Sequence, residues 1–174
     1  MHSPLLSEYL PALRDVSALG PIVDLACGSG RNGLFLARMG LPVVFADHSQ
    51  EALDTVARQL HAEGVSGETW QVDLEVGSGD PLAGRCFAAA LVFRYLHRPL
   101  MPHLIASILP GGLVVYETFT LRNTQYGRPH NPDFLLRPGE LTELFTGWTT
   151  HHSFEGHLPD PDREVAQIVC RKPI

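Results

Sequence analysis

Residues 23–33 read Val-Asp-Leu-Ala-Cys-Gly-Ser-Gly-Arg-Asn-Gly, and this stretch decides the fold. The apolar run over 22–26 predicts a buried strand, and the pattern over 32–39 predicts a helix that ends at a glycine. Between them, three glycines in the spacing G-x-G-x-x-G permit a tight turn and a close approach of the backbone to a ligand. The free N–H groups at the start of such a helix favour an anionic group. The segment therefore predicts a strand, a glycine turn and a helix that together border a binding site.

Outward from this unit, strands and helices alternate along the chain. Alternation of this kind predicts a mostly parallel sheet covered by helices on both faces, with the ligand crevice at the carboxyl ends of the strands. The last two strands are separated by a short Pro- and Asp-rich turn, which predicts an antiparallel hairpin at the sheet edge. We expect an α/β, Rossmann-like three-layer sandwich whose seven strands cover 22–26, 42–46, 69–72, 87–93, 112–118, 148–156 and 164–171, with helices over 5–18, 32–39, 49–60, 99–109 and 140–145.

Composition narrows the class of protein. The chain has 174 residues, 44% of them hydrophobic, which predicts one domain over 1–174. Its net charge of −6 argues against a general nucleic-acid binder. The longest apolar run, over 86–93, is far shorter than the roughly 18 residues of a membrane-spanning helix. The N-terminus has no secretory pattern, and three scattered cysteines suit a reducing cytosol, so we expect a cytoplasmic protein.

Three acidic residues lie in or after the first three predicted strands, and the first of them distinguishes between the possible ligands. Asp24 lies inside the first predicted strand, where a carboxylate would repel the pyrophosphate of a nicotinamide dinucleotide but attract an ammonium group. This favours a ligand with a cationic amino-acid part, such as S-adenosylmethionine. Asp47, after the second strand, is placed to accept both ribose hydroxyls, although it could equally serve the start of the helix that follows. Asp73, after the third strand, is placed to accept the adenine amino group, with Leu74 beside the ring.

The sequence leaves open two alternatives to an enzyme that uses S-adenosylmethionine. A nicotinamide-binding Rossmann protein would share the glycine turn and Asp47, although most dehydrogenases carry a further domain or a Tyr-x-x-x-Lys pair. Lys172 is the only lysine, and no tyrosine lies four residues before it. A cofactor-binding domain without catalytic activity is the other alternative, and it would bind the cofactor without turnover of any acceptor.

The string over 24–33, followed by Asp47 and Asp73, resembles the class I S-adenosylmethionine-dependent methyltransferases, and it is similar to the small bacterial tellurite-resistance-type methyltransferases. The resemblance implies S-adenosyl-L-methionine as the cofactor. After the fourth strand, Arg94 and Tyr95 replace the Asn/Asp-Pro-Pro-aromatic motif of amino-group methyltransferases, which disfavours a nucleic-acid or protein amide nitrogen as the acceptor. The cofactor-binding residues expected from the resemblance are Asp24, Ala26, Gly28, Ser29, Gly30, Asn32, Asp47, His48, Asp73, Leu74 and Arg94.

Charge is distributed unevenly, which bears on the acceptor. Residues 85–137 contain six arginines and two acids, a net of +4, so the rest of the chain carries −10. Such an asymmetry would steer an anion toward the cleft. We therefore expect a small anionic or soft-nucleophile acceptor, and no nucleic acid or membrane as a partner. The residues expected to bind it are Tyr9, Arg31, Glu117, Thr118 and Arg128.

Transfer of a methyl group from S-adenosylmethionine to such an acceptor needs alignment of the two molecules and exclusion of water more than a dedicated base. Arg94 and Tyr95 are the expected catalytic residues, and His97 or His130 would take a proton if the acceptor carries one. Residues 1–20 are a candidate lid that would bring Tyr9 to the site, and 121–138 form a long loop bordering the cleft. No metal site is expected, and a monomer or homodimer is the expected assembly.

Overall fold

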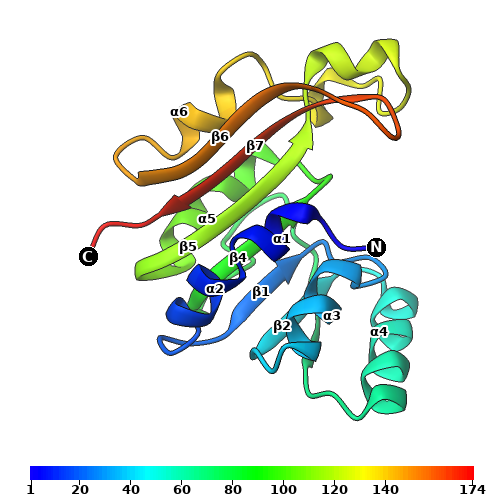
Figure 1. Cartoon of the computed structure of the whole chain (residues 1–174), viewed down its shortest axis with the longest axis vertical. Helices are drawn as coiled ribbons and strands as arrows, with labels where there is room; N and C mark the ends of the chain where they lie inside the picture. Colours follow the sequence, from blue (N-terminus) through cyan, green and yellow to red (C-terminus); the bar gives the residue numbers. More distant parts are fainter.

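The computed structural model describes residues 1–174 and contains one seven-stranded sheet (Figure 1). The strand order is β3-β2-β1-β4-β5-β7-β6. The first five strands of this order are parallel, whereas β7 runs antiparallel to β5 and β6 runs antiparallel to β7. The predicted parallel sheet with its antiparallel C-terminal hairpin is confirmed. The strands are β1 (Ile22–Leu25), β2 (Val43–Asp47), β3 (Glu68–Gln71), β4 (Phe87–Phe93), β5 (Ile108–Phe119), β6 (Thr149–Leu158) and β7 (Arg163–Arg171).

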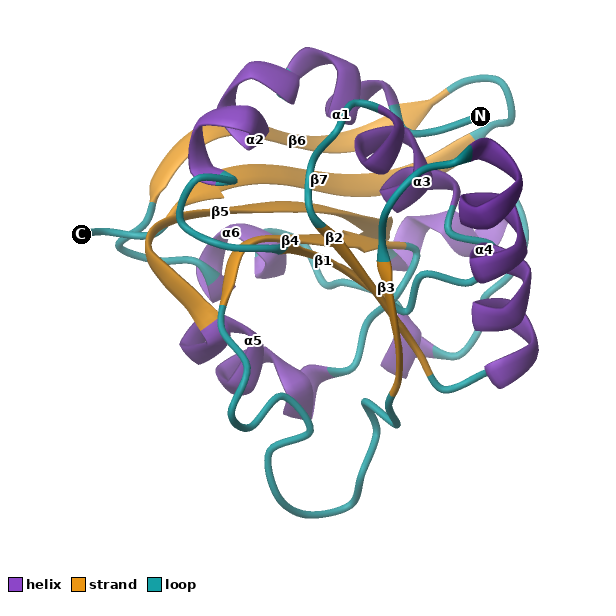
Figure 2. Cartoon of the chain, turned by 90° about the horizontal axis from the view of Figure 1, so that it is seen from below, coloured by secondary structure: helices purple, strands orange, loops and turns teal.

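Helices cover both faces of the sheet, and Figure 2 shows the resulting three layers. Successive strand residues point to opposite faces, so each central strand supplies both cores. The first four helices pack on one face and the last two on the other. None of the helices has the length and apolar composition that crossing a bilayer requires. The helices are α1 (Pro4–Glu8), α2 (Leu10–Val16), α3 (Arg31–Arg38), α4 (Gln50–Glu63), α5 (Met101–Ser107) and α6 (Glu140–Leu144).

Most element boundaries lie within a few residues of those predicted. The Ser49 hydroxyl accepts the Ala52 N–H at 3.2 Å and so caps α4, as its position in the sequence indicates. The predicted helix over 99–109 is shorter, because β5 already begins at Ile108. The predicted loop over 121–138 contains two short 3-10 helices, η2 (Leu121–Gln125) and η3 (Pro132–Phe134). A third, η1 (Arg98–Leu100), leads into α5.

The N-terminal segment forms part of the core. The expected helix over 5–18 is divided at Tyr9 into α1 and α2, which bury Leu5, Leu6, Leu13 and Val16 against the face that also carries α3. The Ser3 N–H donates to Asn32 Oδ1 at 2.9 Å. In this structure the segment is a layer on the sheet face rather than a cover over the carboxyl ends of the strands.

One glycine sets the distance between α3 and the sheet. A Cβ atom on Gly33 would lie 2.5 Å from Phe45 Cε1 and 2.8 Å from Asp24 Oδ2. Real Cβ atoms do not approach other atoms so closely, so only glycine allows α3 to pack directly on β1 and β2 at this point. The third glycine of the turn is therefore required by helix–sheet packing.

We predict that Gly33→Ala lowers the free energy of unfolding by about 1–3 kcal/mol, because the added methyl group overpacks a dense region. Gly77→Ala is the matched control, since a Cβ there meets no atom within 4 Å. Urea unfolding of the three proteins measures the effect. Equal midpoints for Gly33→Ala and the wild type would contradict the close packing described above.

Candidate functional site

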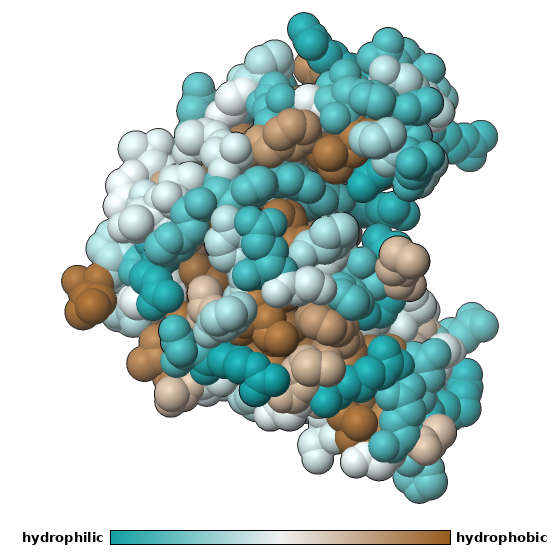
Figure 3. Space-filling model, in the orientation of Figure 1, coloured by the Kyte–Doolittle hydropathy of each residue, from teal (hydrophilic) through white to brown (hydrophobic).

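Two adjoining hollows lie where the parallel strands end, at the notched side of the molecule in Figure 3. The first hollow has a volume of about 160 Å³ and the second about 440 Å³, and both are lined by Glu75 and Tyr95. The other residues of the first hollow are Ala26, His48, Val72, Asp73 and Leu74. Those of the second are Arg94, Leu96, Thr118, Phe119, Arg128, Pro129 and Phe134. A still larger hollow, of about 560 Å³, lies at the opposite ends of the parallel strands, next to the start of β2. It includes none of these residues.

The crevice opens between β1 and β4, where the strand order changes direction. Both strands leave the sheet through a residue in the left-handed region, Ala26 with φ of 51° and Arg94 with φ of 56°. This conformation is uncommon for residues with a Cβ atom, and such strain concentrates at functional sites. Two adjacent strands therefore turn away from each other at the place where a ligand is expected.

The glycines of the turn differ in the space around them, and none of them lines either hollow. Gly28 has φ of 53°, and a Cβ there would meet no atom within 4 Å. Gly30, with φ of 70°, is different, because its Cβ would lie 2.7 Å from Val56 Cγ2. Gly28 is thus the glycine that faces free space, whereas Gly30 and Gly33 are needed for packing.

The Asp47 carboxylate connects the glycine turn to the end of the second strand. Its Oδ2 accepts the Gly28 N–H at 2.8 Å, and its Oδ1 accepts the Ser49 N–H at 2.9 Å. The His48 Nδ1 lies 3.3 Å from the same Oδ1. Both carboxylate oxygens are therefore occupied by backbone donors. The structure gives Asp47 the role of positioning the glycine turn, in addition to the ribose contact that the sequence suggests.

Asp24 is a buried carboxyl group on β1, only 3% exposed, and it lies beside the glycine turn without lining either hollow. Its Oδ2 accepts the Gly33 N–H at 2.9 Å, and the other oxygen has no hydrogen-bond partner. Burial raises the pKa of Asp24 from 3.8 to about 7, against the opposing effects of the Gly33 N–H and the Arg31 charge. A partly satisfied buried carboxyl group is stabilised in its charged form by a cationic ligand.

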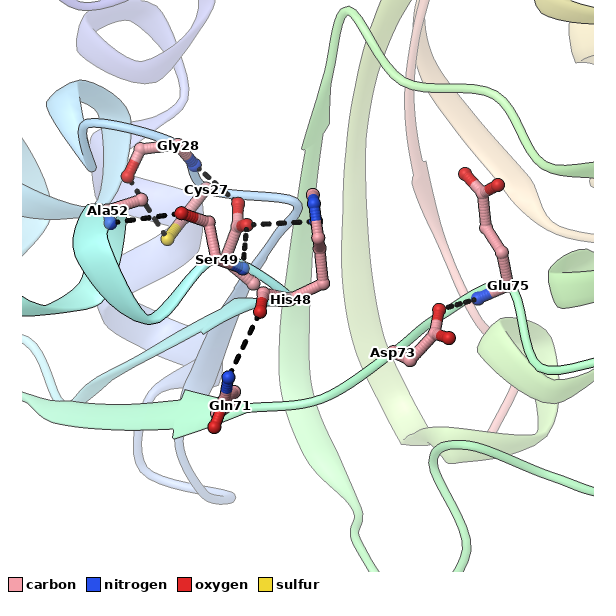
Figure 4. A network of polar contacts seen from close by, with 9 residues as sticks. Cys27, Gly28, His48, Ser49, Ala52, Gln71, Asp73 and Glu75 are labelled. Carbon is pink, nitrogen blue, oxygen red and sulfur yellow. Dashed lines mark hydrogen bonds and ion pairs between the residues drawn. The ribbon is translucent and has the colours of Figure 1, made fainter.

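Asp73 and Glu75 form the other wall of the first hollow. Asp73 Oδ1 accepts the Glu75 N–H at 2.9 Å, and the Glu75 carboxylate points away from Asp73 (Figure 4). Leu74 between them is buried and lines the hollow. The exposed ring of His48 lies on the opposite side. A flat ring entering this hollow would meet Leu74 and His48, with Asp73 at its edge.

Tyr95 separates the two hollows. The hydroxyl of the buried Tyr116 donates to the Tyr95 carbonyl at 2.8 Å and so fixes its backbone. The Tyr95 hydroxyl is itself buried and has no hydrogen-bond partner. Burial and the charges of nearby acids, Glu75 first among them, raise its pKa far above the usual range. Tyr95 therefore remains a neutral hydrogen-bond donor that is available to a ligand.

Arg94 precedes Tyr95 in the chain and lies near two other positively charged side chains. Its pKa is lowered by burial and by the charges of Arg31 and Arg163, against the opposing effect of Glu117. Glu117 is also held by Gln167, whose side-chain N–H donates to it at 2.6 Å. The balance of charge around Arg94 favours an anion.

Several residues predicted from the sequence lie elsewhere. Asn32 is buried and bonds the N-terminus, and Ser29 and Arg31 line a separate hollow with His2. The Tyr9 hydroxyl donates to the His151 carbonyl at 3.4 Å, so its side chain lies against β6. None of these side chains lines either hollow of the site. The glycine-turn motif places Ser29, Arg31 and Asn32 near the site in the sequence, but it does not specify the direction of their side chains.

The two histidines proposed as bases are also placed outside the second hollow. His97 lines a different one with His103, and His130 is exposed and lines neither hollow of the site. Thr118 and Arg128 do line the second hollow, as predicted, whereas Glu117 is buried beneath it.

Fewer arginines of the segment over 85–137 line the cleft than its composition suggests. Arg85 stacks over Trp70 and pairs with Glu68, and Arg98 pairs with Glu140 at 2.6 Å. Only Arg94 and Arg128 of the six line the second hollow. Residues not singled out from the sequence are Glu75, Phe119, Phe134 and Arg163, although Glu75 could have been suggested by its position just after Asp73.

The cysteine and histidine side chains give little support to nucleophilic catalysis by a thiol or to metal binding. Burial and the acids Asp24 and Asp47 raise the pKa of the Cys27 thiol well above its usual range, which disfavours a nucleophilic thiolate. His152 bonds Gln167 at 2.9 Å and His157 bonds Asp162 at 2.8 Å. No three His, Cys, Asp or Glu side chains converge in a way that would hold a metal ion.

Comparison with known proteins agrees with this fold. The family model for the tellurite resistance protein TehB matches residues 2–166. The probable S-adenosyl-L-methionine-dependent methyltransferase TehB of Haemophilus influenzae is 22% identical over 132 residues, which are 73% of this chain and 45% of that protein. The ribosomal RNA small subunit methyltransferase C of Chromohalobacter salexigens is 35% identical over 69 residues, 40% of this chain and 21% of that protein. The chain thus spans less than half the length of these curated relatives.

Solved structures show the same architecture. The crystal structure of TehB from Haemophilus influenzae has a TM-score of 0.73 at 18% identity and covers 93% of this chain and 62% of its own. A methyltransferase structure from Methanosarcina mazei has a TM-score of 0.71 at 16% identity, with 99% and 98% covered. The fold is that of the class I S-adenosylmethionine-dependent methyltransferases. Within this class, the chain belongs to the TehB family.

The raised pKa of Asp24 predicts a pH-dependent stability in the absence of ligand. Between about pH 4 and pH 7 the folded protein keeps the Asp24 proton and the unfolded chain has lost it, so the free energy of unfolding falls as the pH rises. Relative to Asp24→Asn, the wild type should lose stability on the order of 4 kcal/mol across this range and no more above it. Chemical denaturation of both proteins as a function of pH measures the difference. A carboxyl ¹³C titration of Asp24 with its midpoint near pH 4 would contradict the prediction.

Proposed function

We propose that this protein is an S-adenosylmethionine-dependent methyltransferase that transfers a methyl group to a small, anionic or soft-nucleophile acceptor. The observation that carries the proposal is Asp24, a buried carboxyl group beside an open glycine turn. A pyrophosphate next to it would place two negative groups together in a low dielectric, which is costly. A ligand ammonium group would instead compensate the carboxylate, so the nicotinamide alternative is disfavoured.

The residues present fit S-adenosylmethionine. Asp24 and the turn at Gly28 would hold its amino-acid part, and the first hollow, with His48 and Leu74, would hold its adenosine. Asp73 would accept the adenine amino group, and Asp47 would border the ribose. When bound, this cofactor supplies a methyl group on a positively charged sulfur.

The second hollow is the natural acceptor site, because it shares Glu75 and Tyr95 with the first. Arg94 and Arg128 attract and orient an anion there, and the Tyr95 hydroxyl donates a hydrogen bond at the boundary. The aromatic rings of Phe119 and Phe134 reduce the water around the acceptor. Alignment and dehydration by these side chains are the contributions that such a transfer requires.

A small molecule rather than RNA is the proposed partner. The net charge of −6 opposes the phosphate backbone, and the arginines of the site lie inside a hollow. The similarity to ribosomal RNA methyltransferases covers only 40% of the chain. A cytoplasmic location, supported by three free cysteines, and a monomer or homodimer complete the proposal.

We predict that S-adenosylhomocysteine, at 100 times its dissociation constant, raises the free energy of unfolding by about 2.7 kcal/mol, and that NAD and NADP have no such effect. Asp24→Asn should weaken this binding about tenfold or more, because the ammonium group loses its charge partner. Asp15→Asn is the control, since Asp15 is exposed on α2. Isothermal titration calorimetry and thermal shift provide the measurements.

Two results would contradict the proposal. Stabilisation by NAD but not by S-adenosylhomocysteine would restore the nicotinamide alternative. Tight binding of S-adenosylhomocysteine with no methylated product from any anionic or thiol acceptor, followed by mass spectrometry, would favour the cofactor-binding domain without catalytic activity.

A further inference from the structure

The second hollow is larger than a small inorganic anion requires. Its volume is about 440 Å³, and pockets that hold drug-sized organic ligands begin at about 300 Å³. One water molecule takes up about 30 Å³ in the liquid, so an anion of three or four oxygens needs on the order of 100 Å³. A bare oxyanion would leave most of this hollow to water.

Several residues that line the second hollow are apolar. They are Phe119, Phe134, Leu96 and Pro129, and Phe134 is 46% exposed. Exposed aromatic surface beside a hollow is typical of a site that covers an apolar group. An oxyanion has no such group, whereas the body of an organic molecule does.

The charged residues that line the hollow have opposite signs, with Arg94 and Arg128 positive and Glu75 negative. Arg94 lies among positive charges, with Arg31 and Arg163 as neighbours and Glu117 as the opposing acid. Glu75 lies beside Tyr95 at the boundary with the first hollow. A carboxylate is attracted to the arginine side and repelled from the Glu75 side. A ligand with one carboxylate therefore enters in one orientation, with its other end toward Glu75.

Resting on the methyltransferase function proposed above, we propose that the acceptor is an organic acid held in this orientation. Its carboxylate lies at Arg94 and Arg128, its apolar body packs against Phe119 and Phe134, and a hydroxyl or thiol lies at Glu75. Glu75, rather than a histidine, takes the proton that this group must lose.

The proposed step moves one proton to Glu75 and one methyl group to the acceptor. The acceptor's O–H or S–H bond breaks and its proton moves to the Glu75 carboxylate. The lone pair that remains forms the bond to the methyl carbon, while the bond from that carbon to the donor sulfur breaks and leaves its electron pair on sulfur. The products are a methyl ether or thioether of the acid, an uncharged donor sulfur and a protonated Glu75, which returns its proton to water.

The test uses a panel of aromatic and aliphatic hydroxy acids and thiol acids, each paired with its methyl ester, and sodium selenite as the oxyanion. Binding to the full chain saturated with S-adenosylhomocysteine is measured by calorimetry, and products formed with S-adenosylmethionine are measured by mass spectrometry. We expect at least one acid to bind about tenfold or more tightly than its ester, because a charge-assisted pair with arginine is lost in the ester.

Variants separate the parts of the proposal. Arg94→Gln and Arg128→Gln should each remove the preference for the acid over its ester, whereas Arg122→Gln, exposed on η2 and outside the hollow, should not. Phe134→Ala should weaken acid and ester equally. Glu75→Gln should preserve binding of the acid within about threefold while methyl transfer falls and becomes dependent on added base at high pH.

Three results would overturn the inference. If no acid binds more tightly than its ester, or if both arginine variants keep the preference, the carboxylate is not held there. If Glu75→Gln keeps the wild-type rate and pH profile, Glu75 does not take the proton. If selenite is methylated while no acid is, the organic acceptor is wrong although the methyltransferase function stands. Failure of the proposed function itself is recognised separately, because S-adenosylhomocysteine would then not bind.

Discussion

A carboxyl group buried at the end of a central strand is the constraint on which the rest of the site depends. Asp24 is only 3% exposed to solvent, so its carboxyl group depends on partners in the backbone and, in the proposed function, in the ligand. The Gly33 N–H at 2.9 Å is the partner that the fold supplies. That bond requires α3 to begin directly above β1, and this is possible only because Gly33 has no side chain to collide with Phe45. The position of the glycine turn follows from this packing.

Neighbouring strands then complete the crevice. Asp47 at the end of β2 holds the turn through the Gly28 N–H, and Tyr116 on β5 holds the backbone of Tyr95 after β4. Ala26 and Arg94 adopt left-handed conformations at the ends of the two central strands, and each costs roughly 1–2 kcal/mol. Burial of the strands on both faces supports these conformations, since the sheet cannot relax locally without exposing its core. The crevice is thus kept open by the parts of the molecule that are least able to move.

Sequence patterns were sufficient for the sheet, because strands and helices depend on local periodicity, and they also predicted acidic residues at the ends of the first three strands. Apolar runs indicated the central strands and β-like runs around a Pro- and Asp-rich turn indicated the C-terminal pair, and acids directly after parallel strands lie at the carboxyl ends of those strands. The patterns failed where the direction of a side chain is set by tertiary contacts. Tyr9 lies against β6 because the expected helix is divided there, and Arg98 is turned toward Glu140 and the backbone of the long loop. Glu75 and Phe134 acquire their positions from loop conformations that no spacing rule specifies.

The two halves of the cleft differ in how they are held together, and this has a consequence for specificity. The first hollow rests on strand ends whose positions are fixed by the core, whereas the second is closed by the loop over 121–138. That loop is held by polar contacts: Arg98 donates to Glu140 and to the Leu135 carbonyl at 2.9 Å, and Asn123 Oδ1 accepts the Glu164 N–H at 3.0 Å. Substitutions at the exposed positions of this loop leave those contacts and the core untouched. A change at these loop positions therefore alters the second hollow without altering Asp24 or the glycine turn. What the second hollow accepts must for this reason be inferred from its own shape and charge rather than from the glycine-turn motif.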